Sequence, residues 1–100
     1  MHAVSASTVT GTKVTNYQDE DLGKIEEVML DFTSGEVAYL VLSFGGIFGT
    51  TVADKRFAVP MNAIAIVKDS DGDIEYKLDV SKDFLKNAPG FDKDHYPDYA

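Results

Sequence analysis

The chain has 100 residues, 44% of them hydrophobic, a length that allows one globular domain with a single core but not two. Nine basic residues against 17 acidic ones give a net charge of -8, which repels a phosphate backbone and excludes non-specific binding to nucleic acid. The absence of cysteine excludes disulfides, thiolate metal sites and cysteine nucleophiles.

No membrane segment is expected. The longest nearly apolar stretch, residues 37–49, is too short to span a bilayer as a helix and contains three glycines. The first residues lack the basic start and apolar core of a secretion signal. We therefore expect no direct membrane insertion and a cytoplasmic location, with the periplasm as the alternative if a leader has been removed.

Residues 1–10 are mostly small or polar without a period, and they predict a flexible N-terminal arm. A barrel-forming domain is expected over residues 11–80. It begins with a short β-prone run at 13–17, which the acidic residues 18–21 close as a hairpin turn.

Residues 23–32 alternate imperfectly, because Ile25 stands three positions before Val28. A β-bulge at Glu26 and Glu27 would restore one inward face. A helix over 20–30 is the alternative, but the Val and Phe residues that follow and the Thr-Ser-Gly turn at 33–35 favour a strand.

The run at 36–44 is apolar on both faces: Val37, Tyr39 and Val41 alternate with Ala38, Leu40, Leu42 and Phe44. An antiparallel strand usually leaves one face in water. This strand is therefore expected to be central and covered twice, by the barrel interior on one side and by a helix, the tail or a second subunit on the other.

The second half of the chain predicts shorter elements around clear turn signals. Ser81 is a candidate N-cap, with Asp83 in the first turn of the helix that follows. The expected elements are a glycine corner at 45–49, a polar continuation at 50–54, strands at 56–60, 64–67 and 74–78, a connector at 61–63, a turn at 69–73, and, within a C-terminal region 81–100, a helix at 82–86 and an aromatic, acidic tail at 91–100.

Four stretches carry a family resemblance: residues 11–14, residues 21–25 followed by Asp31, residues 35–39 leading into 43–46, and residues 57–60. In this order and spacing the chain resembles the PRC-barrel family, named for the H subunit of the photosynthetic reaction centre and also found at the C-terminal end of the bacterial ribosome maturation factor. The ending, residues 85–97, looks like that of stand-alone bacterial members. The chain departs from the family pattern at 49–54, which is poor in glycine, and at Met61, where an aromatic residue is common.

The resemblance implies an all-β fold: a small, open antiparallel barrel of about six strands that serves as a docking surface in larger assemblies. It implies no family-wide catalytic residue and no cofactor. Because one fold hosts many functions, the resemblance predicts the structure far better than the activity.

Three patterns suggest a site for a metal ion or a phosphate group, and each has a simpler interpretation. Asp69, Asp71 and Asp73 alternate as calcium ligands do, but the glycine stands too early and no closing Glu follows, so a turn is favoured. The glycines at 45, 46 and 49 lack the Lys-Ser/Thr of a phosphate loop. His95 stands among Asp92, Asp94 and Asp98, yet the only other histidine is His2.

The remaining hypothesis is an interface built from aromatic and apolar residues of the glycine corner, the central strand and the tail, because such side chains anchor protein contacts. Whether the tail folds back to plug the open barrel or contacts another subunit stays open. The candidate residues are Tyr39, Ile47, Phe48, Phe91, Tyr96 and Tyr99.

No nucleophile, base and orienting group form a pattern, so the sequence predicts that the protein is not an enzyme. We expect a protein-interaction or adaptor module that pairs with itself as a homodimer and recruits an unknown protein partner. The alternative is a domain that binds a small ligand or a divalent cation through its acidic turns at 18–21 and 69–73.

Overall fold

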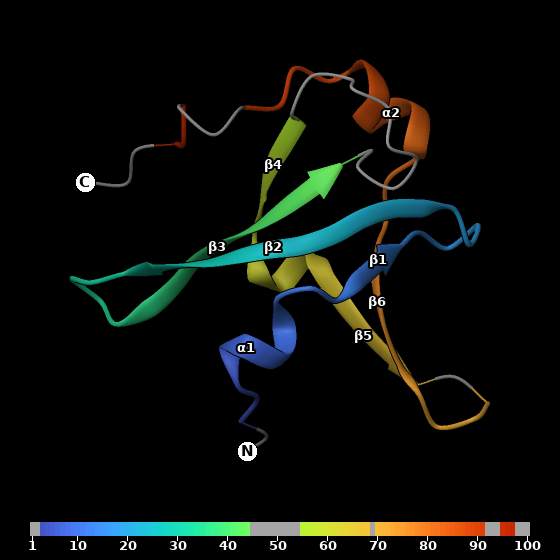
Figure 1. Ribbon diagram of the computed structural model, residues 1–100, viewed down its shortest axis with the longest axis horizontal. Helices are drawn as coiled ribbons and strands as arrows, with labels where there is room; N and C mark the ends of the chain where they lie inside the picture. The colour runs from blue at the N-terminus through green and yellow to red at the C-terminus, as the bar shows by residue number, and fades with distance from the viewer. Residues whose placement is uncertain (1–2, 45–54, 69, 92–94, 98–100) are drawn as a thin grey trace.

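The computed structural model describes residues 3–44, 55–68, 70–91 and 95–97. The elements are α1 (Ala6–Val9), β1 (Lys13–Thr15), β2 (Asp21–Asp31), β3 (Glu36–Phe44), β4 (Lys55–Val59), the 3-10 helix η2 (Met61–Ala63), β5 (Ile64–Lys68), β6 (Ile74–Leu78) and α2 (Lys82–Asn87). The strands form one six-stranded sheet in the order β4-β3-β2-β1-β6-β5 (Figure 1). The fold is therefore mostly β, as the sequence predicts.

The long strand β2 confirms the choice of strand over helix. Its pairing with β3 shifts register between Ile25 and Glu27, where the sequence predicts a bulge. A second shift, between Met29 and Leu30, has no signal in the sequence. The chain then turns at 32–35 and enters β3, whose bounds are those expected.

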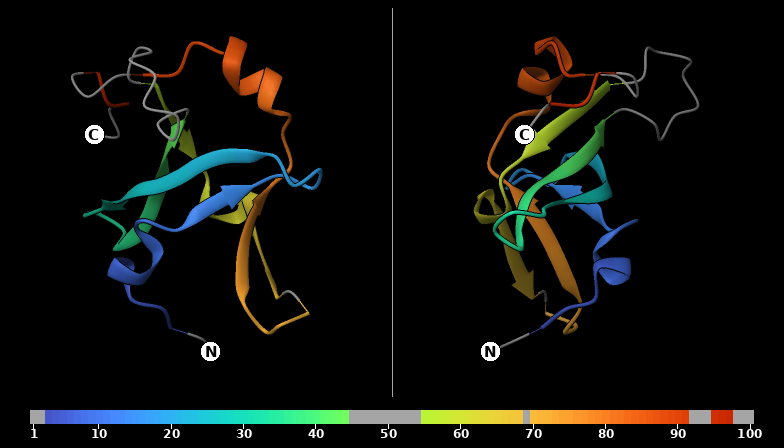
Figure 2. Two further views of the ribbon diagram at one scale, coloured as in Figure 1. Left: turned by 45° about the vertical axis from the view of Figure 1, so that its right-hand side comes forward. Right: turned by 90° about the vertical axis from the view of Figure 1, so that its left-hand side faces the viewer.

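One pairing departs from the expected antiparallel barrel. β1 and β6 run parallel, with Val14 opposite Tyr76, so the sheet is mixed. The cause lies after β4, where Pro60 and η2 turn a corner without reversing the chain. β5 therefore keeps the sense of β4, and the β5–β6 hairpin presents β6 to β1 in the same direction. Among the described residues β4 and β5 do not pair with each other, so the curled sheet stays open (Figure 2).

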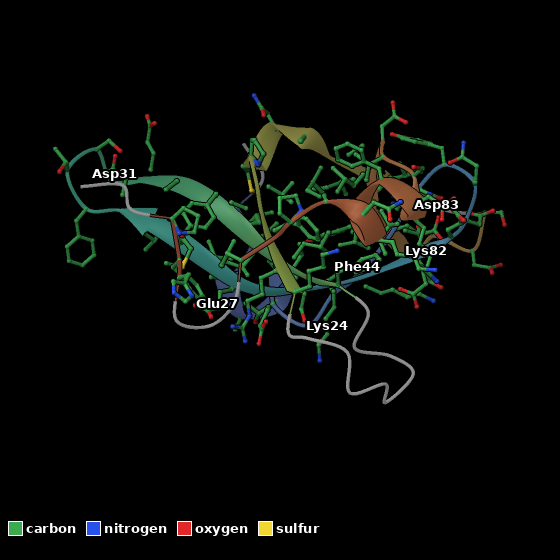
Figure 3. The ribbon with its side chains drawn as sticks, turned by 90° about the horizontal axis from the view of Figure 1, so that it is seen from above. Lys24, Glu27, Asp31, Phe44, Lys82 and Asp83 are labelled. Carbon is green, nitrogen blue, oxygen red and sulfur yellow. The ribbon has the colours of Figure 1, made fainter. Side chains whose placement is uncertain are left out.

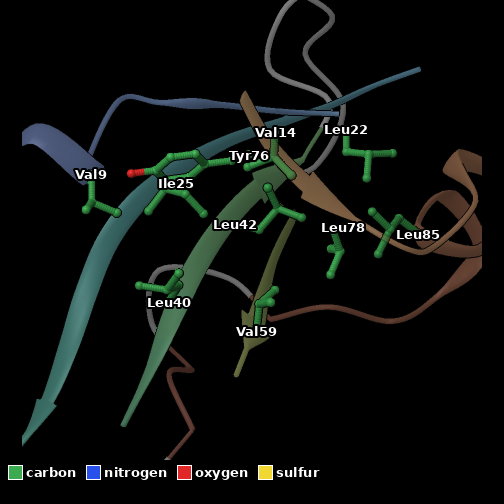
Figure 4. Close-up of a cluster of buried hydrophobic side chains, with 10 residues drawn as sticks. All are labelled: Val9, Val14, Leu22, Ile25, Leu40, Leu42, Val59, Tyr76, Leu78 and Leu85. Atoms are coloured by element: carbon green, nitrogen blue, oxygen red, sulfur yellow. The ribbon is translucent and has the colours of Figure 1, made fainter. Parts of the chain in front are cut away.

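The core fills the concave side of the curled sheet (Figure 4). Val14, Leu22, Ile25 and Leu42 are fully buried at its centre, and Leu85 of α2 closes one end. Burying a side chain of this kind stabilises the fold by about 1.5–3 kcal/mol. Every strand except β5 contributes a residue to the cluster of buried side chains.

Of the two short α-helices, α2 is predicted by the sequence and α1 is not. Ser81 caps α2 by accepting a hydrogen bond from the Phe84 amide at 3.0 Å, as expected. Residues 6–9, in contrast, form α1 instead of part of an irregular arm. The buried Val9 anchors α1 to the core, and a four-residue helix is too short to show a period. The glycine corner at 45–49 lies outside the described residues.

Candidate functional site

The structure brings together three of the six predicted interface residues. Tyr39 lies on β3, while Phe91 and Tyr96 belong to the C-terminal segment, the name used below for Phe91 together with residues 95–97. The Tyr39 hydroxyl donates a hydrogen bond to the Pro97 carbonyl at 3.4 Å. Ile47, Phe48 and Tyr99 lie outside the described residues.

The central strand β3 is covered on both faces, which confirms the prediction from its two apolar faces. Its residues from Tyr39 to Leu42 are at most 3% exposed. Leu40 and Leu42 belong to the core, whereas Tyr39 and Val41 point to the opposite side of the sheet. That side of β2, β3 and β4 is called the outer face below.

The C-terminal segment lies against this outer face and along the free edge of β4. The Arg56 amide donates to the Phe91 carbonyl at 2.8 Å, and the Phe91 amide donates to the Arg56 carbonyl at 2.7 Å. These bonds form an isolated antiparallel bridge beside the sheet. Within a single chain, therefore, the C-terminal segment covers part of the face whose covering the sequence left open.

Tyr96 is the centre of the polar contacts on the outer face. Its hydroxyl donates a short hydrogen bond to the Glu27 carboxylate, and its ring packs edge-on against the Phe91 ring at 4.9 Å between centroids. The Arg56 guanidinium lies 5.7 Å from the centroid of the Tyr96 ring. Figure 3 shows Glu27 beside the last described stretch of the chain.

Arg56 is held by the carboxylate of Glu26, the residue before Glu27. Its Nε lies 2.9 Å and its Nη2 3.2 Å from the two carboxylate oxygens of Glu26, a bidentate pair. The hydrogen bond from Arg56 lowers the pKa of Glu26 below its ordinary value. The bulge places Glu26 and Glu27 so that one pairs with the arginine and the other with the tyrosine.

Sequence reasoning missed Glu26, Glu27 and Arg56 as partners of the tail. Two signals were available, since Arg56 is the only arginine of the chain and the two glutamates occupy the predicted bulge. Neither signal reveals which distant segment they meet, because the hydrogen bond from Tyr96 to Glu27 joins positions 69 apart.

The Glu27 carboxylate and burial together raise the pKa of Tyr96 to about 12, because the hydrogen bond stabilises the protonated phenol and the negative charge opposes its ionisation. Because the pKa of Tyr96 is raised from 10.0, the hydrogen bond from Tyr96 to Glu27 contributes fully to attachment of the segment below pH 10. This contribution is lost as the pH rises through about 12.

The substitution Glu27→Gln is expected to bring the pKa of Tyr96 back toward 10.0, because a neutral amide does not oppose the tyrosinate charge. The ultraviolet absorbance of tyrosinate, followed during an alkaline titration, measures this. The late transition of the unmodified protein should disappear in Glu27→Gln and persist in the control Glu36→Gln, whose side chain is exposed. A late transition that survives Glu27→Gln would show that another group raises this pKa.

A second polar cluster closes the turn between β1 and β2. Asn16 is fully buried, and its side chain bonds to the Glu20 carboxylate at 2.7 Å and to the Val80 carbonyl at 3.1 Å. Lys77, 6% exposed, donates to the Asp19 carboxylate at 2.9 Å and to the Asn16 carbonyl at 3.2 Å. Asp19 raises the pKa of Lys77, so the lysine stays charged. This cluster ties β1 to β6 and has a structural role.

The structure describes only some of the predicted metal candidates. Among the described residues, no group of three or more His, Asp or Glu side chains is placed to hold a metal ion. His95 is exposed, and Asp92, Asp94 and Asp98 lie outside the described residues, as does Asp69 of the acidic turn.

The exposed apolar side chains of the described residues include two clusters. At the tip of the β2–β3 hairpin, Leu30 pairs with Val37, and Phe32 is 96% exposed. The second is a groove of about 850 Å³ between the N-terminal residues and the β5–β6 hairpin. The groove is lined by Ala3, Val4, Thr8, Thr12, Ile66, Ile74 and Tyr76.

The helices within the described ranges are all too short to cross a bilayer. No curated protein matches this chain at a significant level. The family model for the PRC-barrel domain matches residues 1–84, which include all six strands. This match covers most of the chain and agrees with the curled, open sheet, and the chain therefore belongs to the PRC-barrel domain family.

Proposed function

We propose that this PRC-barrel domain is a non-catalytic interaction module that pairs with a second copy of itself and recruits another protein. The observation that carries self-association is the outer edge of β5, which pairs with none of the described strands and has an exposed isoleucine at its midpoint. Ile66 is the third of five residues in β5 and is 58% exposed. The cytoplasmic location expected from the sequence stays a prediction.

The β5 edge lacks the usual protection against pairing with another strand. Natural edge strands are blunted by proline, by a bulge or by charged side chains that face inward. β5 carries one charge, Lys68, at its last position, and its register with β6 is regular. The strand contains no carboxylate, so the net charge of -8 is not concentrated where two copies would meet.

Two identical β5 edges can pair antiparallel about a two-fold axis, the commonest symmetry of homodimers. With the axis at Ile66, the two isoleucines face each other, and the Lys68 stem lies over Ile64 of the second copy. The two sheets then continue into one. The apolar grooves beside Ile66 and Ile74 lie next to this junction and are shielded from water by it.

Ile66→Lys is expected to weaken the dimer by about thirtyfold or more, since it places two like charges across the axis and removes a central apolar contact worth ~2 kcal/mol. Sedimentation equilibrium over a range of protein concentrations measures the dissociation constant. The matched control is Phe32→Lys, which adds the same charge at an exposed apolar position on a different hairpin.

The unmodified chain and Phe32→Lys should sediment as dimers and Ile66→Lys as a monomer. An unmodified chain that stays monomeric at the highest concentration would contradict self-association itself. A dimer lost in Phe32→Lys but kept in Ile66→Lys would move the contact to the β2–β3 hairpin tip.

A further inference from the structure

The free edge of β4 can accept more of a strand than it holds. Both backbone groups of Arg56 bond to Phe91, so they point away from β3. Backbone directions repeat every second residue in an antiparallel ladder, and the amide and carbonyl of Ala58 therefore point to the same open side. Within the described ranges no backbone hydrogen bond joins Ala58 to the C-terminal segment.

Proline stops the chain's own segment from continuing this ladder. With Arg56 opposite Phe91, the residue that would face Ala58 is Pro89. Proline has no amide hydrogen to donate to the Ala58 carbonyl. The chain therefore holds the edge of β4 through a single bridge, and a segment with an ordinary residue at this position could add a second pair of bonds.

The side chains of the C-terminal segment also make their contacts outside the core, so the segment can leave without disturbing the core. Phe91 and Tyr96 lie outside the buried core cluster, and their partners Glu27 and Arg56 are polar groups of the outer face. An incoming tyrosine finds a carboxylate that accepts from its hydroxyl and a guanidinium over its ring. The outer face thus specifies an aromatic residue with a hydroxyl group.

We infer that the β4 edge and the outer face form a strand-addition site, which the C-terminal segment occupies in the free chain and which an extended, tyrosine-bearing segment of another protein takes over. Main-chain pairing supplies affinity at such sites, and side-chain pockets supply specificity. The net charge of -8 favours a segment with neutral or basic flanks. This inference goes beyond self-association and uses the opposite end of the sheet from β5.

A second copy is a poorer occupant than another protein. Its C-terminal segment carries the same proline and makes the same contacts as the tethered segment. The tethered segment acts at an effective concentration in the millimolar range, so an identical competitor rarely displaces it. A segment that also pairs with Ala58 gains two backbone bonds, enough to change this balance.

The test uses the full-length chain and two fluorescein-labelled peptides of residues 87–97, one with Pro89 kept and one with Pro89→Val. Fluorescence anisotropy measures their binding to the unmodified chain, to Tyr96→Ala, in which the tethered segment is loosened, and to the control Tyr17→Ala, at a tyrosine 54% exposed. Circular dichroism checks that each variant is folded, and Tyr96→Phe, which removes only the hydroxyl, serves as a milder second variant.

Tyr96→Ala is expected to bind the Pro89→Val peptide about tenfold more tightly than the unmodified chain or Tyr17→Ala does, because its own segment competes less. On Tyr96→Ala, the Pro89→Val peptide should bind about tenfold more tightly than the peptide with Pro89, through the added bonds at Ala58. Equal affinities of the two peptides would overturn the choice of another protein and favour exchange of segments between copies. Failure of both peptides to bind folded Tyr96→Ala and Tyr96→Phe would overturn the site, whatever the oligomeric state.

Discussion

Gly23→Ala is expected to destabilise this domain by about 3–5 kcal/mol, a large fraction of the total stability of a small protein. Gly23 has a φ of 128°, which a side chain rarely adopts. A Cβ atom there would lie 2.0 Å from the Ser43 carbonyl oxygen and 3.0 Å from its carbon. Both are backbone atoms of β3, so relief requires β2 and β3 to separate at the centre of the sheet.

Urea denaturation followed by circular dichroism measures the free energy of unfolding. Gly35→Ala is the matched control, since Gly35 also has a positive φ, 76°, but a Cβ there would meet nothing within 4 Å. It should lose only about 1–2 kcal/mol, the cost of a left-handed residue with a side chain. Similar losses in the two variants would show that the backbone conformation, and not the contact with Ser43, decides the effect.

Asn16→Ala is expected to lower the free energy of unfolding by about 2–3 kcal/mol, because it removes a fully buried side chain that makes four hydrogen bonds. Its Oδ1 accepts from the Gln18 and Glu20 amides at 3.0 and 2.9 Å and so shapes the turn before β2. Its Nδ2 ties this turn to the Val80 carbonyl beyond β6.

The control is Asn87→Ala, at an exposed asparagine whose amide donates to the Asp83 carbonyl at 3.0 Å within α2. A loss of at most about 0.5 kcal/mol is expected there. Chemical denaturation of both variants, with unchanged dependence on denaturant, gives the comparison. Equal stability of Asn16→Ala and the unmodified protein would mean that water replaces all the bonds of Asn16.

Local patterns in the sequence predict most of the sheet. The turn signals at 33–35 and 69–73 mark the starts of β3 and β6, the interruption after Ile25 places the bulge, and the two apolar faces of β3 predict its double coverage. Each of these features depends on residues that are neighbours along the chain. A cap such as Ser81 is predictable for the same reason.

The parts that could not be predicted depend on distant neighbours. The parallel pairing of β1 with β6 follows from the corner at η2. The residues of this corner do not indicate in which direction the chain leaves it. The contact of Tyr96 with Glu27 likewise requires the tail to return across the sheet. Aromatic composition indicated that the tail packs against something, and geometry alone identifies the surface.

The corner at η2 also has a consequence for the order of folding. β1 to β4 form consecutive antiparallel pairs, whereas Asn16 and Lys77, which join the first strand of the chain to the last, stand 61 positions apart. Closing so long a loop costs more conformational entropy than closing a hairpin, so pairs of this kind form late. During synthesis β1 therefore waits with one edge unpaired until β6 has left the ribosome. Until β1 pairs with β6, the nascent chain is most exposed to aggregation.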